Sequence, residues 1–140
     1  MIRLRVPGAL KYRDLAIRAV AAACKLVGNE DGARHKNEFT DQVVSAFGEA
    51  FNNAAVHSYR GRDRGDVEIE IELAPGAAIT IRLIDYGTSF DFDDVPVPDL
   101  DELPESGLGV YIIRSFMDVV TYRPGAPNVL SMTKSLRRAP

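Results

Sequence analysis

The sequence is poor in the residues that build disulfides and zinc sites. It contains one cysteine and two histidines, which excludes an internal disulfide and argues against a zinc centre. Cys24 follows Ala21, Ala22 and Ala23, and this setting predicts a small buried residue of a helix. A catalytic role for the thiol would need an activating base nearby, and the sequence indicates none.

The sequence also lacks long apolar runs and a basic excess. No apolar stretch approaches the roughly 18 residues of a membrane span, and the first residues do not resemble a secretory leader. We therefore expect a cytoplasmic protein with no membrane partner. Lys and Arg number 17 against 20 Asp and Glu, and the net charge of -3 argues against direct nucleic-acid binding. The cluster of Arg60, Arg62 and Arg64 is most simply a solvated loop.

The remaining composition is that of an ordinary globular domain. With 140 residues, 46% of them hydrophobic, the chain is long enough for one core, and we expect a single domain over residues 1–140. The spacing of apolar residues predicts a strand at 2–6, helices at 9–27 and 37–57, strands at 67–73 and 79–84, a helix at 107–118, and strands at 119–122 and 129–136. In the helix at 9–27, the apolar residues at helical spacing are Leu10, Leu15, Ile17, Val20, Ala23, Leu26 and Val27.

This order of elements is typical of an α+β fold. Because strands adjacent in sequence mostly pair antiparallel, we expect a two-layer α/β sandwich with a mixed, mostly antiparallel sheet and about three helices on one face. Glu68, Glu70 and Glu72 alternate with apolar residues, which indicates that the other face is open to water or to a partner. Residues 86–106 have no periodicity, and long loops of this kind are often lids or binding loops.

The first segment with chemical interest lies in the predicted helix 37–57. Its apolar residues form one broad arc: Phe39, Val43, Ala46, Phe47, Ala50, Phe51 and Ala54. Glu49 and Asn53 lie just beyond the edge of this arc, one turn apart and on one face. Glutamate can act as a general base, and an amide oxygen is a ligand that suits magnesium. Taken alone, the pair is more simply a surface acid and an incidental amide.

Two further segments contain glycine. Asp85 ends an apolar strand and could accept a hydrogen bond from an exocyclic amine such as that of adenine, while Gly87 would let the backbone approach a flat ring. A strand-ending turn explains the same residues. Gly107, Leu108 and Gly109 open the last predicted helix, where free backbone amides favour phosphate. A loop hinge at the helix entry is an equally simple explanation for that glycine pair.

In their order and separation the three segments resemble the GHKL ATP-binding superfamily, which includes DNA gyrase and the histidine kinases. More narrowly, they are similar to bacterial anti-sigma-factor serine kinases. The resemblance covers about residues 10–136. It is carried by Glu49-Ala-Phe-Asn-Asn53, by Asp85-Tyr-Gly87-Thr-Ser-Phe-Asp91, by Gly107-Leu-Gly109 and by the ending Asn128-Val-Leu-Ser-Met-Thr133-Lys134.

The resemblance implies a role for each candidate residue. Glu49 would be the catalytic base and Asn53 the ligand of Mg2+. Asp85 would bind the adenine amine of ATP, with Gly87 beside the ring and Thr133 supporting adenine from the last strand. The residues that would line the phosphates are Gly107, Leu108 and Gly109.

The same resemblance implies a regulatory function with protein partners. The expected activity is ATP-dependent phosphorylation of a serine or threonine on an anti-sigma-factor antagonist. The expected second partner is a sigma factor, sequestered by a homodimer so that transcription is regulated. An alternative is a non-catalytic ATP-binding switch that binds a sigma factor or another regulator. A detached histidine-kinase catalytic domain fits less well, because the sequence shows no helical hairpin with an acceptor histidine.

Overall fold

The computed structural model describes residues 1–27, 33–59, 65–93 and 108–136. In chain order the elements are β1 (Ile2–Pro7), a short helical turn η1 (Leu10–Tyr12), α1 (Arg13–Val27), α2 (Ala33–Asn52), a π-helical turn η2 (Asn53–Ser58), β2 (Asp66–Ala74), β3 (Ala78–Asp85), α3 (Leu108–Phe116), β4 (Val119–Arg123) and β5 (Asn128–Ser135). Within these ranges no helix is both long enough and apolar enough to cross a membrane.

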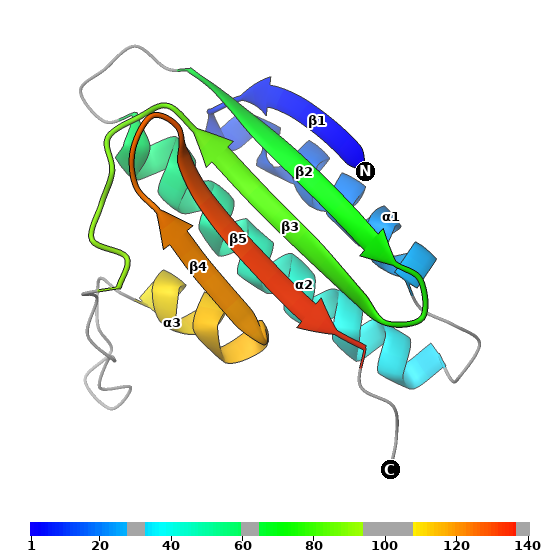
Figure 1. The fold of residues 1–140 in the computed structure, drawn as a ribbon. Coiled ribbons are helices and arrows are strands. Elements are labelled where there is room, and N and C mark those ends of the chain that lie inside the picture. The colour runs from blue at the N-terminus through cyan, green and yellow to red at the C-terminus, as the bar shows by residue number, and fades with distance from the viewer. Residues whose placement is uncertain (28–32, 60–64, 94–107, 137–140) are drawn as a thin grey trace.

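The five strands form one sheet in the order β1-β2-β3-β5-β4. The three longer helices lie behind one face of this sheet, and no helix among the described residues lies on the other face (Figure 1). The α+β two-layer prediction is therefore confirmed. The expected sheet was mixed and mostly antiparallel, whereas every pairing among the described strands is antiparallel.

Helix α2 forms the centre of the core. All seven residues of its predicted apolar arc are buried, and Phe47 and Phe51 are fully enclosed beside the inward-facing isoleucines of β2 and β3. Full burial of a large apolar side chain contributes about 1.5–3 kcal/mol, so this arc fixes the orientation of α2 on the sheet. Glu49 and Asn53, at the edge of the arc, are each half-buried.

Helix α1 differs from its prediction in the face that it buries. Its buried residues are Ala16, Val20, Ala23, Cys24 and Val27. Leu15 and Leu26, expected on the apolar side, are 56% and 63% exposed. The reason is packing, because mostly small side chains on the inner face let α1 lie close to α2 and the sheet. The predicted burial of Cys24 is confirmed.

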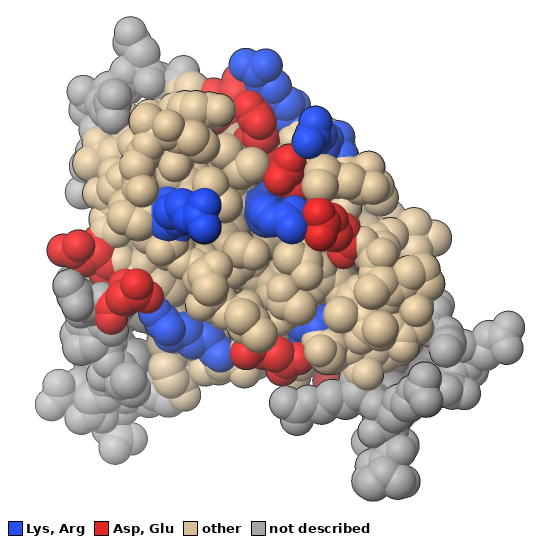
Figure 2. Space-filling model, in the orientation of Figure 1, with Lys and Arg blue, Asp and Glu red and all other residues tan. Residues whose placement is uncertain are grey.

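The helix-free face of the sheet carries paired charges. Arg82 on β3 lies 3.0 Å from a carboxylate oxygen of Glu72 and 3.7 Å from one of Glu70, and Arg3 on β1 lies 3.2 Å from the other oxygen of Glu70. Figure 2 views this face and shows charges of both signs gathered on its β1–β3 side. Glu70 and Glu72, two of the three alternating glutamates of β2, are thus paired with arginines of the neighbouring strands.

Candidate functional site

Glu49 and Asn53 lie where α2 changes its helical geometry. Glu49 belongs to the last turn of α2, and Asn53 is the first residue of η2. The sequence predicted one helix through His57, and the chain indeed stays helical as far as Ser58 but widens into a π turn at Asn53. Such turns are rare and occur frequently at functional sites.

Gly109 packs directly against this acid and amide. A Cβ atom at Gly109 would lie 2.9 Å from Oε2 of Glu49 and 3.8 Å from Oδ1 of Asn53. The structure therefore brings two of the three predicted segments together, although they are more than fifty residues apart in sequence. Leu108 opens α3 beside Gly109 and is 39% exposed. Gly107 lies outside the described residues, so its expected role stays a prediction.

This junction has the chemistry of an anion and cation site. The first residues of α3 present backbone N–H groups that no helical carbonyl accepts, and these groups favour phosphate. Gly109 itself adds no side chain beside these groups. The two oxygens that Gly109 faces, a carboxylate and an amide oxygen, are hard ligands of the kind that magnesium prefers.

Asp85 ends β3 on the helix-covered face of the sheet and is 5% exposed. Its Oδ1 accepts the backbone N–H of Gly87 at 2.9 Å and the Nδ2 amide of Asn128 at 2.9 Å. Its Oδ2 accepts the Ser58 hydroxyl at 3.3 Å. Asp85 is thus a buried carboxylate held in one orientation by hydrogen bonds, as a side chain that recognises a ligand group requires.

Asn128 contacts Asp85, although the resemblance assigned it no role. It is fully buried, and it lies directly opposite Asp85 in the β3–β5 register. It lies one residue before the strand that the apolar spacing predicts at 129–136. The sequence offers no local signal for this contact, because the burial of Asn128 and its polar partner follow from the β3–β5 register.

Gly87 has no room for a side chain, and the residue that fills the space is Ser58. A Cβ atom at Gly87 would lie 2.2 Å from the Ser58 carbonyl oxygen, which also accepts the N–H of Thr88 at 2.6 Å. The close backbone approach predicted for Gly87 is therefore an approach to η2. Asn53 is the first residue of η2, and Ser58, which also binds Asp85, is the last. The turn η2 therefore connects Asn53 with Asp85.

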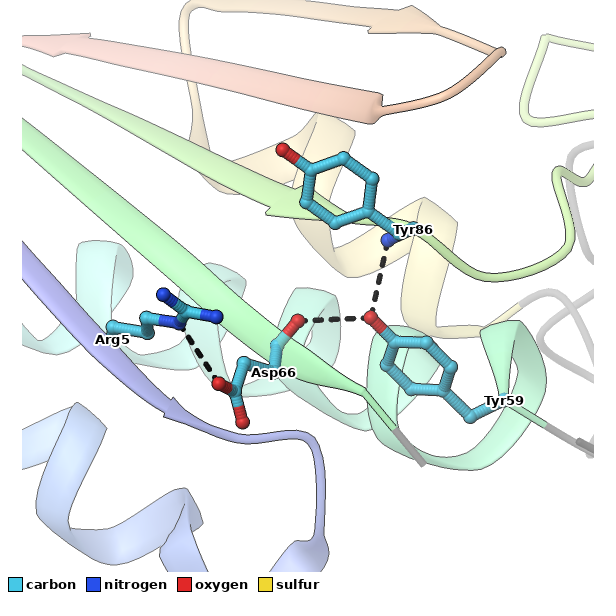
Figure 3. Close-up of polar contacts among 4 residues, drawn as sticks. All are labelled: Arg5, Tyr59, Asp66 and Tyr86. Carbon is cyan, nitrogen blue, oxygen red and sulfur yellow. Dashed lines mark hydrogen bonds and ion pairs between the residues drawn. The ribbon is translucent and has the colours of Figure 1, made fainter. Parts of the chain in front are cut away.

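Tyr59 adds a second connection between η2 and the end of β3. Its ring is 6% exposed, and its hydroxyl accepts the N–H of Tyr86 at 3.1 Å and donates to the carbonyl of Asp66 at 2.9 Å (Figure 3). Arg5 in turn binds the carboxylate of Asp66 at 2.8 Å. The chain segment that carries Asp85 is therefore fixed from the side of η2 as well as from β5.

Thr133 does not join the other predicted residues. Its hydroxyl lies 2.9 Å from that of Thr80, its partner in the β3–β5 register. Because side chains alternate along a strand, Thr80 and Asp85 point to opposite faces of β3. Thr133 therefore lies on the helix-free face, away from Asp85, and the position on β5 that contacts Asp85 is Asn128.

Residues 86–93, the described part of the predicted loop 86–106, contribute two rings to an aromatic cluster. Phe90 and Phe92 pack on Tyr122 of β4, with ring centroids 4.9 and 5.7 Å away. Arg114 of α3 covers the Phe92 ring at 4.7 Å and binds Asp93 at 3.1 Å. Burial, together with the charge of the Asp85 carboxylate, raises the pKa of Tyr122. The start of the loop is thus joined to α3, while residues 94–106 lie outside the described part.

The comparisons with known proteins agree with this geometry. Residues 12–134 match the histidine kinase-like ATPase domain family. Serine-protein kinase RsbW of Bacillus pumilus is 26% identical over 147 aligned positions, which cover 99% of this chain and 87% of that protein. Serine-protein kinase RsbW of Staphylococcus aureus strain MRSA252 is 31% identical over 146 positions, with 98% and 87% covered. These relatives bear the name of the enzyme class that the motifs predicted.

A solved structure supports the same fold. The histidine kinase domain of the Erythrobacter litoralis EL346 blue-light activated histidine kinase matches with a TM-score of 0.56 at 16% identity. The match covers 94% of this chain and 62% of the longer chain, and at this identity it shows the fold alone. With matched motifs, a matched fold and matched relatives, the chain belongs to the histidine kinase-like ATPase domain family.

Proposed function

We propose that the protein is an ATP-dependent serine/threonine protein kinase that acts on an anti-sigma-factor antagonist. The observation that carries this proposal is the packing of Gly109 against Glu49 and Asn53, with η2 connecting that junction to the buried Asp85. One continuous unit thus holds a general base in Glu49, a cation ligand in Asn53, and a hydrogen-bond acceptor for the adenine amine in Asp85. It also holds the start of α3, which can bind phosphate. The serine-kinase names of the relatives support the same activity.

The site residues bind ATP at its two ends, which are the adenine ring and the phosphates. Asp85 accepts the adenine amine, and Gly87 shapes the backbone beside it. Asn128 takes the supporting position on the last strand that was expected of Thr133, because it is Asn128 that contacts Asp85. The phosphates bind at the start of α3 through Leu108 and Gly109, and through Gly107 if its predicted role holds.

Magnesium binding is the second part of the proposal. Asn53 supplies the protein ligand, and this fits an ion that often takes only one or two protein ligands besides phosphates and water. The amide oxygen lies 3.8 Å from the position that a Cβ atom of residue 109 would occupy, and Gly109 itself has no side chain to cover it. When bound, the ion supplies charge neutralisation to the phosphate chain.

Glu49 performs the proton transfer. It is half-buried at the edge of α2 and lies against the start of α3, beside the proposed phosphate position. The substrate hydroxyl oxygen attacks the terminal phosphorus, its proton passes to Glu49, and the bond to the leaving ADP oxygen breaks. Positioning of the hydroxyl and removal of its proton are the contributions of this chain to the reaction.

The partners follow from the same proposal. The protein substrate is the antagonist, and a sigma factor is the second partner, bound by a homodimer in the cytoplasm.

The test is transfer of labelled phosphate from ATP to a cognate antagonist. Glu49→Ala is expected to reduce transfer about 100-fold or more, as loss of a general base does, and to keep ATP affinity in calorimetry. Glu38→Ala is the matched control, because Glu38 is an exposed acid on the same helix. Transfer by Glu49→Ala at the wild-type rate would contradict the role of Glu49. ATP binding without transfer by the wild-type protein would favour the non-catalytic switch instead.

A further inference from the structure

We propose that Asn128 is a specificity-determining residue, which fixes the orientation of Asp85 and thereby selects nucleotides with a 6-amino purine. The inference rests on the proposed function, because it assumes that Asp85 faces the purine. Asn128 itself acts as a positioning residue through Asp85. Hydrogen bonds fix each of the two side chains.

The amide group of Asn128 has one possible orientation. Its Nδ2 donates to Oδ1 of Asp85 at 2.9 Å and to the carbonyl oxygen of Gly87 at 2.9 Å. Its Oδ1 accepts the N–H of Gly125 at 2.9 Å and the hydroxyl of Ser89. All four hydrogen-bonding positions of the amide are used, so a flipped amide would place donor against donor and acceptor against acceptor.

The two oxygens of Asp85 are consequently not equivalent. Oδ1 receives two short hydrogen bonds, from Asn128 and from the backbone N–H of Gly87. Oδ2 receives one longer bond, from the Ser58 hydroxyl at 3.3 Å. Oδ2 therefore keeps the capacity to accept another donor, and the exocyclic amine of adenine is such a donor. A 6-oxo purine would instead oppose its oxygen to the carboxylate.

This arrangement predicts what an isosteric amide at position 85 would do. In Asp85→Asn, the donors of Asn128 and Gly87 require the amide oxygen at the inner position. The amide nitrogen must then occupy the outer position, where it presents a donor to the purine. A group that accepted from adenine is thus replaced by one that donates to the oxygen of a 6-oxo purine. The preference for a 6-amino purine over a 6-oxo purine is therefore expected to invert and not merely to weaken.

The experiment measures dissociation constants of ATP and ITP by calorimetry with magnesium. Wild-type protein is expected to prefer ATP about tenfold or more, as a charged hydrogen bond implies. Asp85→Asn is expected to bind ITP more tightly than ATP. In Asp85→Asn with Asn128→Asp, the introduced carboxylate attracts the amide nitrogen inward, because charge-assisted hydrogen bonds are about twice as strong as neutral ones. The double variant is therefore expected to bind ATP more tightly relative to ITP than Asp85→Asn does. A loss of packing caused by the two substitutions would not restore the preference for ATP.

A second variant keeps the inference testable if Asp85→Asn does not fold. Asn128→Ser retains Asp85 but removes its amide donor, so the carboxylate can turn away and the ATP-to-ITP preference is expected to fall. Ser131→Ala is the control, because Ser131 pairs with Arg82 on the helix-free face and is expected to leave the preference unchanged.

The outcomes distinguish failure of the role of Asn128 from failure of the proposed kinase function. A folded Asp85→Asn that still prefers ATP, or an unchanged preference in Asn128→Ser, overturns the role of Asn128 and leaves the kinase proposal standing. If the wild-type protein binds neither nucleotide, the proposed function fails and the inference with it.

Discussion

At the residue scale, Gly87 and Gly109 exclude a side chain for different physical reasons. A Cβ at Gly87 would lie within 2.2 to 2.7 Å of three atoms of Ser58, two of which belong to the backbone. A Cβ at Gly109 would instead meet the end of the flexible Glu49 side chain at 2.9 Å. The first contact cannot relax without moving η2, whereas the second relaxes when Glu49 changes rotamer.

The two alanine substitutions should therefore behave differently. Gly87→Ala is expected to lower the free energy of unfolding by about 2 kcal/mol or more, as overpacking against backbone does. Gly109→Ala is expected to change it by no more than about 1 kcal/mol, because alanine also favours the helix. It should nevertheless slow phosphate transfer about tenfold or more, since Glu49 is displaced. Urea unfolding and the transfer assay check both, and equal destabilisation would contradict the distinction.

Cys24 gives a second prediction at this scale. Burial raises the pKa of its thiol from 9.0 to about 12, against a smaller opposite effect of the hydrogen bond with Thr40. The native thiol is therefore neutral at pH 8 and should resist iodoacetamide, while urea-unfolded protein should react fully. Because only the unfolded state releases this proton above pH 9, this group lowers stability as the pH rises from 9 to about 12. Rapid labelling of native protein would contradict its burial.

At the scale of elements, the position of α3 depends on a buried lysine. Lys134 on β5 is 8% exposed, and its Nζ donates to the carbonyl of Phe116, the last residue of α3, at 2.7 Å. A positive charge at this end of a helix is favourable. Since α3 begins with Leu108 and Gly109, the same contact holds the proposed phosphate site in place.

Replacement of this lysine should affect both stability and binding. Lys134→Met is expected to lower the free energy of unfolding by about 1–2 kcal/mol through the lost charged hydrogen bond, and to weaken ATP binding. Lys25→Met is the control, because Lys25 is exposed in the last turn of α1 and should change stability by less than about 0.5 kcal/mol. Urea unfolding and calorimetry provide the two measurements. Equal effects of both variants would argue against the helix-end role.

At the scale of the whole molecule, one nucleotide would contact elements from both halves of the chain. The proposed site joins α2 and η2 with β3, α3 and β5, so that bound nucleotide stabilises their packing against one another. A ligand that binds only the folded state adds about 2.7 kcal/mol at a hundredfold excess over its Kd. This gain is available only if the whole site is assembled.

Magnesium-ATP is therefore expected to raise the Tm by about 5–10 °C at that excess. Removal of magnesium with EDTA should reduce this shift and abolish phosphate transfer, because the proposed role of Asn53 needs the ion. Asn53→Ala should show the reduced shift even with magnesium present. Thermal unfolding followed by circular dichroism measures all three. A shift that EDTA leaves unchanged would contradict the magnesium part of the proposal.

Patterns within single elements were predicted well from the sequence. The arc on α2 contains large apolar residues at helical spacing, and all seven of its members are buried. The alternation in β2 and β3 likewise predicted which of their side chains face the core. Leu15 and Leu26 on α1 were predicted wrongly, because that helix contacts the core through mostly small residues and hydrophobicity alone does not mark such a face.

Amino-acid order by itself determined the elements, the α+β class and the candidates Glu49, Asn53, Asp85 and Gly109. The elements depend on spacing within a helix or strand, which local geometry dictates, and the candidates depend on the order and separation of three short segments that together resemble a known family. Only the tertiary structure decided that Asn128, and not Thr133, contacts Asp85. That choice depends on the register of β5 against β3, and a shift of one residue would exchange the two faces of the strand. Contacts between residues 43 positions apart set this register, and no local pattern records them.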